Sequence, residues 1–204
     1  LRDLYTEPFI VNWRLTRIGA TSPQMPGITV PYEAFPGSIG VMPGQPEIEL
    51  IKEREANLAG AGGVVLTPSP GGALPANICG ENGSHTNDCL RTIPPRENGG
   101  NMDVQQMQVG TRLLFPCFID GCGLFAGDIH YAQGDGEVSG TAIEMGTVTT
   151  LRVKKVHRGK AASMQMPATI GNDQIIDMEP TRYYQTVGIP LKSKGEIPPS
   201  HQYL

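Results

Sequence analysis

Several features that mark other classes of protein are missing from this sequence of 204 residues. No stretch approaches the roughly 18–20 consecutive apolar residues of a membrane-spanning helix, so we expect no membrane partner. The 16 Lys and Arg residues are outnumbered by 20 Asp and Glu, which gives a net charge of −4, and they form no basic stripe. Nucleic acid is therefore not an expected partner either.

Cysteine is also scarce, and the four cysteines fit no common zinc-binding spacing and form no C-x-x-C pair. Cys117 and Cys122 have apolar neighbours, so we expect them to be buried free thiols. Cys79 and Cys89 bracket a polar loop and could pair in an oxidising compartment. We expect a cytoplasmic protein, which needs no such disulfide.

Glycine and proline, in contrast, are abundant, with 26 Gly and 18 Pro residues. This composition is typical of short strands joined by turns and unusual for a helical protein. The length suits one domain, and we assign residues 1–204 to it. The sequence therefore predicts a mainly β fold in a single domain.

One helix is predicted at residues 46–58. Pro46 suits its first turn, acidic residues follow, and Gly60 comes after its end. Strands are predicted where apolar and polar residues alternate or β-branched residues gather. These strands cover residues 9–13, 111–118, 122–131 and 137–156.

Two segments show no continuous pattern of a helix or a strand. Residues 30–41 are expected to form two extended pieces around a turn at Pro36 and Gly37. Residues 60–92 lack periodicity and form a long Gly/Pro-rich loop. A loop of this length is either a lid, a binding loop or a subunit contact, or it is disordered.

The segment between Gly127 and Glu144 holds the densest group of side chains capable of chemistry. Alternate residues of a strand share a face, so Asp128 and His130 are expected to project together. Gln133 and the three residues after it form a predicted turn that reverses the chain. A hairpin would bring Asp128, His130 and one of two glutamates together. The polar residues of the segment are Asp128, His130, Gln133, Asp135, Glu137 and Glu144.

A second polar run lies upstream, at residues 94–103. It contains Asn101 and Asp103 next to two glycines. These side chains can serve a site, or they can simply stabilise a turn through bonds to the backbone.

These runs resemble the acetamidase/formamidase family of amide hydrolases. The resemblance rests on four motifs and covers nearly the whole chain from about residue 9. It implies a predominantly antiparallel, β-sandwich-like domain, here with one helix and long loops. It also implies hydrolysis of short aliphatic amides, such as formamide and acetamide, to a carboxylate and ammonia. The motifs are Phe-Pro-Gly-Ser-Ile-Gly-Val-Met-Pro-Gly at 35–44, Pro-Arg-Glu-Asn-Gly-Gly-Asn-Met-Asp at 95–103, Gly-Asp-Ile-His-Tyr-Ala-Gln-Gly-Asp-Gly-Glu at 127–137 and Gly-Thr-Ala-Ile-Glu at 140–144.

The chain departs from the family at its ends. Family members have N-terminal Asn-Pro-x-Thr-Gly-Pro and Pro-Gly-Asp motifs that find no match here, and they continue beyond the last residue. We therefore expect an internal portion of a longer member. The surface that the absent portions would cover should be apolar or buried against another copy. This predicts a homo-oligomer, with the 60–92 loop as a contact.

Amide hydrolysis requires an activated nucleophile, a polarised carbonyl and a proton for the leaving nitrogen. We expect a divalent metal, zinc, held by Asp128, His130 and Glu144. Glu137 or Glu144 would act as general base and then acid. The predicted catalytic residues are thus Glu137, Glu144 and His130, and the predicted substrate-binding residues are Asn101, Asp103 and Gln133.

Two alternatives stay open at this stage. Cys117 or Cys122 can act as the nucleophile with His130 as base, although apolar surroundings would raise the pKa of either thiol. A Gly-x-Ser-x-Gly elbow is not present, so a serine hydrolase of that type is not indicated. The second alternative is an inactive β-sandwich subunit with a binding or structural role.

Overall fold

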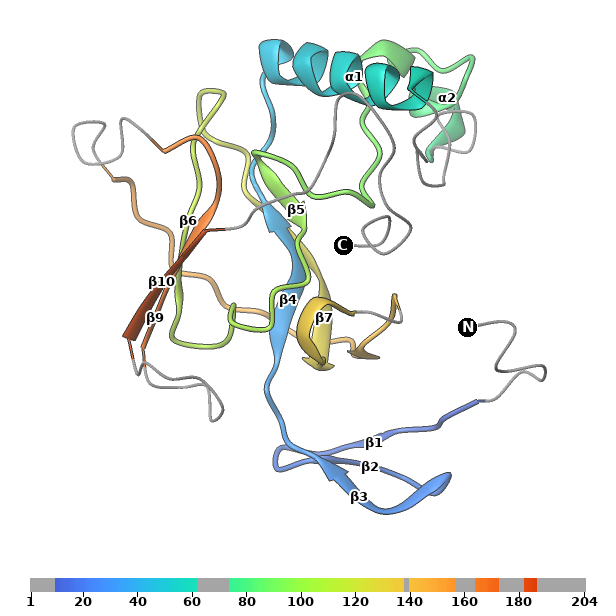
Figure 1. Ribbon diagram of the computed structural model, residues 1–204, viewed down its shortest axis with the longest axis vertical. Coiled ribbons are helices and arrows are strands. Elements are labelled where there is room, and N and C mark those ends of the chain that lie inside the picture. Colours follow the sequence, from blue (N-terminus) through green and yellow to red (C-terminus); the bar gives the residue numbers. More distant parts are fainter. Residues whose placement is uncertain (1–9, 62–73, 138–139, 157–163, 173–181, 187–204) are drawn as a thin grey trace.

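The computed structural model describes residues 10–61, 74–137, 140–156, 164–172 and 182–186. Within these ranges the protein is mainly β, with three antiparallel sheets and one helix longer than a single turn (Figure 1). The predicted class, mainly antiparallel β with one helix, is confirmed. No helix in the described ranges is long and apolar enough to span a membrane.

The central sheet has four strands in the order β5-β4-β7-β8, and it carries most of the side chains singled out above. Strand β4 lies between β5 and β7, and β8 forms one edge. Figure 1 shows β4 and β7 running side by side through the middle of the molecule. The strands are β4 (Phe35–Gly40), β5 (Gly99–Asn101), β7 (Phe125–Ala132) and β8 (Ile143–Glu144).

Two three-stranded sheets accompany the central one. The first has the order β1-β2-β3 and extends away from the central sheet at the bottom of Figure 1. The second has the order β10-β9-β6. Their strands are β1 (Arg14–Leu15), β2 (Ala20–Ser22), β3 (Met25–Val30), β6 (Arg112–Leu114), β9 (Ala168–Asn172) and β10 (Arg182–Thr186).

Helix α1 (Gln45–Gly60) confirms the predicted helix. Pro46 lies in its first turn, where no intrahelical N–H bond is required. Ile51 and Leu58 are its buried residues. The helix therefore packs through a narrow apolar face, and Glu49 and Glu53 are exposed to solvent.

Ion pairs tie helix α1 to the 91–97 segment. Glu55 accepts hydrogen bonds from Arg91 and from Arg96, and Arg96 is 5% exposed. Arg54 pairs with Glu97 at 2.5 Å. This network holds the start of the second polar run against the helix, since both partners of each pair are largely shielded from water.

The predicted state of the cysteines is wrong for one pair. Cys117 and Cys122 form a disulfide with Cα atoms 4.9 Å apart, and Cys117 is exposed. Gly121, Cys122 and Gly123 all have positive φ, so the chain turns tightly enough to bring the two sulfurs together. The apolar neighbours of Cys117 and Cys122 suggested buried thiols, but these neighbours do not bury the turn at residues 121–123.

Cys79 and Cys89 form a second disulfide. It closes a compact segment that contains α2 (Ala76–Cys79) and the short helix η2 (Thr86–Asp88). This segment is the later part of the predicted 60–92 loop, and residues 62–73 of that loop lie outside the described residues.

Four predictions of extended structure differ from the structure. In the predicted strand at 111–118, only residues 112–114 form a strand, β6. Residues 10–13 are not in a strand, and the first strand is β1. The predicted turn at Pro36 and Gly37 is instead inside β4, which is continuous. In the 137–156 range the described residues form a strand only at β8, and residues 146–156 pair with no strand in the described part of the chain.

Alternation along β7 gives the central sheet two different faces. Tyr131 packs with Ala20 and Ala132 in one apolar cluster. His130 points to the other face, where the ring of Phe35 meets it edge-on at 5.1 Å between centroids. Phe35 belongs to a second cluster with Ile39, Met102 and Met107. The candidate site thus lies against a packed apolar layer.

Candidate metal centre

His130 is the centre of the candidate site, and its side chain is 1% exposed. Its Nδ1 lies 2.7 Å from Oε1 of Gln133, and Nε2 of Gln133 donates to the Asp103 carbonyl at 2.7 Å. Because Gln133 presents an oxygen to the ring, Nδ1 carries the proton and donates it. The lone pair of Nε2 is therefore free to bind a cation.

Three carboxylates surround Nε2 of His130. Asp128 Oδ1 and Glu144 Oε2 each lie 3.5 Å from it, and Glu137 Oε1 lies 3.8 Å from it. Nε2 is buried without a hydrogen-bond partner in the described part of the chain. A buried lone pair facing carboxylate oxygens is unfavourable unless a positive charge lies among them.

The spacing of these atoms suits a zinc ion. Zinc bonds to nitrogen and oxygen at about 2.0–2.2 Å with tetrahedral angles, which places two ligand atoms about 3.4 Å apart. The two 3.5 Å separations from Nε2 match this value. Imidazole nitrogen and carboxylate oxygen are both ligand types that zinc accepts.

Two overlapping sets of three ligand atoms meet at His130. One consists of Asp103, His130 and Glu137, and the other of Asp128, His130 and Glu144, with atoms in each set within 4.8 Å of one another. The structure brings together the three residues that the hairpin argument grouped. It also adds Glu137, so both glutamates reach the imidazole rather than one.

Strand pairing explains why these residues meet. His130 on β7 is opposite Glu144 on β8 and opposite Phe35 on β4. The register of β7 and β8 shifts after His130, and the chain between them passes through η3 (Asp135–Glu137). This longer connection, in place of a two-residue hairpin turn, carries Glu137 back to the imidazole.

The backbone of the site is locally strained. Asp103, Asp128 and Glu137 have φ of 52°, 55° and 43°. In the described ranges they account for three of four non-glycine residues with positive φ, and the fourth is Cys122. Side chains disfavour this conformation, and it concentrates at functional sites in proteins. Its presence at three clustered carboxylates indicates that their placement serves more than packing.

Gly37 leaves the space that the site needs. A Cβ at this position would lie 2.6 Å from Cε1 and Nε2 of His130 and 2.9 Å from Oδ1 of Asp103. Its carbonyl accepts hydrogen bonds from the N–H groups of Met102 and Asp103. Strand β4 therefore both contacts the imidazole and holds the end of the second polar run.

The carboxyl groups of Asp103 and Glu137 are suited to carry a proton. The pKa of Asp103 is raised to about 7, chiefly by burial and also by the neighbouring Glu137 and Asp128, while His130 opposes this. Burial likewise raises the pKa of Glu137, aided by Glu144 and Asp128. A carboxyl that titrates near neutral pH, as Asp103 does, is effective in proton transfer.

Ser38 is a site residue that the sequence argument did not single out. Its Oγ lies 2.8 Å from Oδ1 of Asn101 and 3.2 Å from Oδ2 of Asp128. The only sequence signal was its place in the motif at 35–44. Asn101 thus contacts the site through Ser38, and Gln133 bonds inside the protein to His130.

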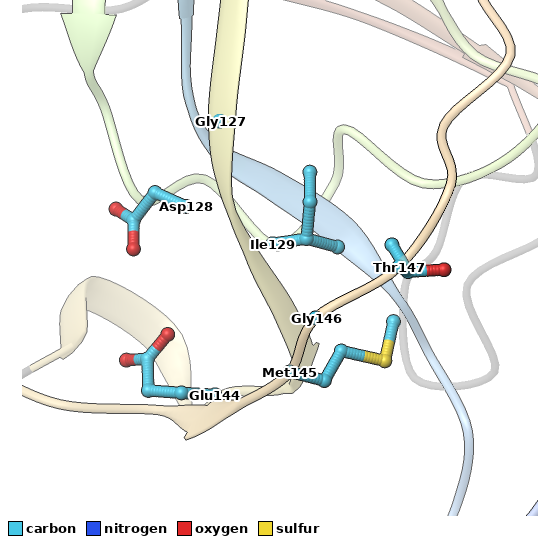
Figure 2. Close-up of a pocket in the computed structure, with 7 residues that line it drawn as sticks. All are labelled: Gly127, Asp128, Ile129, Glu144, Met145, Gly146 and Thr147. Carbon is cyan, nitrogen blue, oxygen red and sulfur yellow. The ribbon is translucent and has the colours of Figure 1, made fainter.

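A shallow depression of about 520 Å³ opens beside the site. Figure 2 shows the side chains of Asp128 and Glu144 pointing toward one another on one side of it, with Ile129, Met145 and Thr147 on the other. A small molecule placed here would meet carboxylates on one side and apolar groups on the other.

The alternative nucleophiles do not fit this arrangement. Attack by cysteine requires a free thiolate, and Cys117 and Cys122 are bonded to each other. The structure therefore contradicts the mechanism in which either cysteine attacks the amide.

Comparison with known proteins agrees with the motifs. A model of the acetamidase/formamidase family matches residues 1–201. The chain belongs to the acetamidase/formamidase family. This family consists of amide hydrolases, so the resemblance noted in the sequence is confirmed at the level of the family.

Individual members of the family are similar over most of this chain. An acetamidase of Mycolicibacterium smegmatis is 33% identical and a formamidase of Methylophilus methylotrophus 28% identical, each over 78% of this chain. A solved structure of a gamma lactamase from Delftia acidovorans is 29% identical, with a TM-score of 0.62 over 77% of this chain. The chain spans 41% of the length of both curated relatives and 40% of the solved structure.

Proposed function

We propose that the protein hydrolyses the C–N bond of short aliphatic amides, such as formamide and acetamide, with the help of a zinc ion. The observation that carries the proposal is the buried Nε2 of His130, which has no hydrogen-bond partner in the described ranges and faces three carboxylates within 3.8 Å. Family membership supports the reaction class.

Asp128, His130 and Glu144 are the proposed zinc ligands. The side chains of Asp128 and Glu144 are 41% and 48% exposed and border the depression, so a substrate can reach them. Asp103 and Glu137 are more buried and do not line the depression, so they are not among the proposed ligands. A zinc ion held by Asp128, His130 and Glu144 would polarise the carbonyl of the substrate amide and lower the pKa of a water molecule bound to the zinc.

Glu137 is the proposed general base and acid. It accepts a proton from the attacking water as the water oxygen bonds to the carbonyl carbon. It then returns the proton to nitrogen as the C–N bond breaks and ammonia leaves. The raised pKa of Glu137 supports both steps, and Asp103 beside it provides a second carboxyl that can share the proton.

The depression supports a small acyl group. Ile129 and Met145 provide apolar surface across from Asp128 and Glu144, which matches an amide with a short alkyl chain. The names of two relatives, acetamidase and formamidase, point to substrates of this size.

The test combines zinc content with ammonia release. We expect the purified chain to bind about one zinc ion and to release ammonia from formamide or acetamide, with loss of turnover in a chelator and recovery on adding zinc. His130→Ala should lower turnover by roughly 10²-fold or more while the fold is kept. His85→Ala is the matched control, because His85 is exposed in the disulfide-closed segment.

The outcomes separate the functions. Near-normal turnover in His130→Ala would refute the mechanism. A chain that binds no zinc and releases no ammonia would leave the alternative of a binding or structural subunit.

We also infer that the protein self-associates. Val148 and Val153 are 94% and 74% exposed in an alternating segment that pairs with no strand in the described residues. Such a segment is a suitable edge for another copy to cover. A monomeric mass in light scattering at micromolar concentration would contradict this inference.

A further inference from the structure

Ser38 stands between two polar partners from different strands. It is opposite Asn101 of β5 on one side and opposite Gly127 of β7 on the other. Its Oγ lies 2.8 Å from Oδ1 of Asn101 and 3.2 Å from Oδ2 of Asp128. The hydroxyl therefore connects an amide on β5 with a proposed zinc ligand on β7.

Ser38 cannot donate to Asn101 and to Asp128 at the same time, so in one of the two contacts the partner must be the donor. A serine hydroxyl has a single proton, and both neighbouring oxygens accept. An ionised carboxylate can only accept, whereas an amide can turn by half a revolution and present its NH₂ instead. With Asn101 turned in this way, each of the two contacts of Ser38 joins one donor and one acceptor.

We propose that Asn101 and Ser38 form a hydrogen-bond relay that orients Asp128, an inference that rests on the proposed function. Asn101 donates from its NH₂ to Ser38, and Ser38 donates its only proton to Oδ2 of Asp128. Oδ1 of Asp128, which lies 3.5 Å from Nε2 of His130, is then left for zinc. Ser38 and Asn101 are positioning residues in this scheme, and Asn101 acts through Ser38 instead of contacting the substrate.

Asp128 needs such support for two reasons. Its backbone has a φ of 55° within β7, so strand geometry alone does not fix the direction of its side chain. Its side chain is also 41% exposed, which leaves other rotamers open to it. Hydrogen bonds to the second oxygen of a ligand carboxylate orient it, and their loss commonly weakens metal binding about 10- to 100-fold.

The experiment measures zinc affinity of the 204-residue chain by competition with a chromophoric chelator. We expect Ser38→Ala to weaken zinc binding about 10- to 100-fold, and Ser38→Thr, which keeps the hydroxyl, to restore most of it. Asn101→Ala should also weaken zinc binding. In the Ser38→Ala background the Asn101→Ala change should add no further loss, because the relay is already broken.

Ser84→Ala is the matched control, since Ser84 lies in the disulfide-closed segment and bonds to His85. Its zinc affinity should equal that of the unmodified chain. Circular dichroism of each variant establishes that the fold is kept.

Each result decides between the proposals. Unchanged zinc affinity in Ser38→Ala would overturn the relay and leave the zinc centre intact. A further loss from Asn101→Ala in the Ser38→Ala background would also overturn it, as would a raised KM in Asn101→Ala at unchanged zinc affinity, which would indicate substrate contact. Absence of zinc binding by the unmodified chain would overturn the zinc centre and the relay together.

Discussion

Gly37 lies so close to His130 that any larger side chain at position 37 would displace the imidazole. A Cβ at position 37 would be 2.6 Å from Nε2, the atom proposed to bind zinc. The glycine is needed for space and not for an unusual φ, because it is absent from the residues with positive φ. The backbone of β4 at Gly37 therefore helps to fix the position of the His130 imidazole on β7.

Gly37→Ala is therefore expected to displace His130 and Asp103. The new methyl group must push the imidazole aside, which should cost about 1–3 kcal/mol of stability. Zinc affinity should fall strongly although the fold is kept, because the ligand atoms of His130, Asp128 and Glu144 would no longer surround one point. Gly60→Ala is the control, since a Cβ at Gly60 meets nothing within 4 Å. Normal zinc binding in Gly37→Ala would contradict this account of the site.

Separate substitutions of the carboxylates should distinguish ligands from the proton carrier. Asp128→Asn and Glu144→Gln are expected to lose zinc and activity together. Glu137→Gln should keep zinc but lower turnover roughly 10²- to 10⁴-fold, as for other general bases. Glu53→Gln, on the exposed face of α1, should change neither quantity. Loss of zinc in Glu137→Gln, with zinc retained in Glu144→Gln, would exchange their roles.

Asp103 should make the zinc-free protein less stable as pH rises. Its pKa is about 7 in the folded chain against an ordinary value of 3.8. Between these values the unfolded chain has lost a proton that the folded chain keeps, so the free energy of unfolding falls as pH increases. Urea unfolding in a chelator at pH 5 and pH 7.5 measures this difference. Asp103→Asn should flatten it, and an unchanged pH dependence in that variant would refute the prediction.

The Glu55 network should contribute stability with the opposite dependence on pH. Burial alone would raise the pKa of Glu55, but hydrogen bonds from Arg91 and Arg96 outweigh this and lower it. The contribution is therefore present above the ordinary value of 4.5 and is lost as pH falls below it. Glu55→Gln leaves the buried Arg96 without its carboxylate and should cost about 3 kcal/mol at pH 7. A loss no larger than in Glu53→Gln would show that the network is dispensable.

The parts of the fold that local chemistry decides could be predicted from the sequence. Helix α1 starts where Pro46 fits a first turn, and β7 covers most of the predicted strand at 122–131. Alternation along that strand was enough to group Asp128 with His130. The positive φ of Asp128 was not foreseeable, because the alternation pattern assumes regular strand geometry at every residue.

Errors arose where the partner of a segment decided its structure. Pro36 and Gly37 together suggest a turn, yet they lie inside β4. Pro36 is tolerated because β5 pairs only with residues 38–40 of β4, so a missing N–H costs no bond on that side. The alternating residues 147–153 have strong β propensity but find no neighbouring strand in the described ranges.

The short edge strand β8 gives the two halves of the proposed zinc centre different rigidity. His130 lies on an eight-residue strand bonded on both sides, whereas Glu144 lies on a two-residue strand at the rim. A zinc ion bound by both His130 and Glu144 would hold the edge strand β8 against β7. We expect amide exchange at Met145, whose N–H bonds to the carbonyl of Ile129, to slow on zinc binding, so that occupancy of the site becomes readable in the backbone itself.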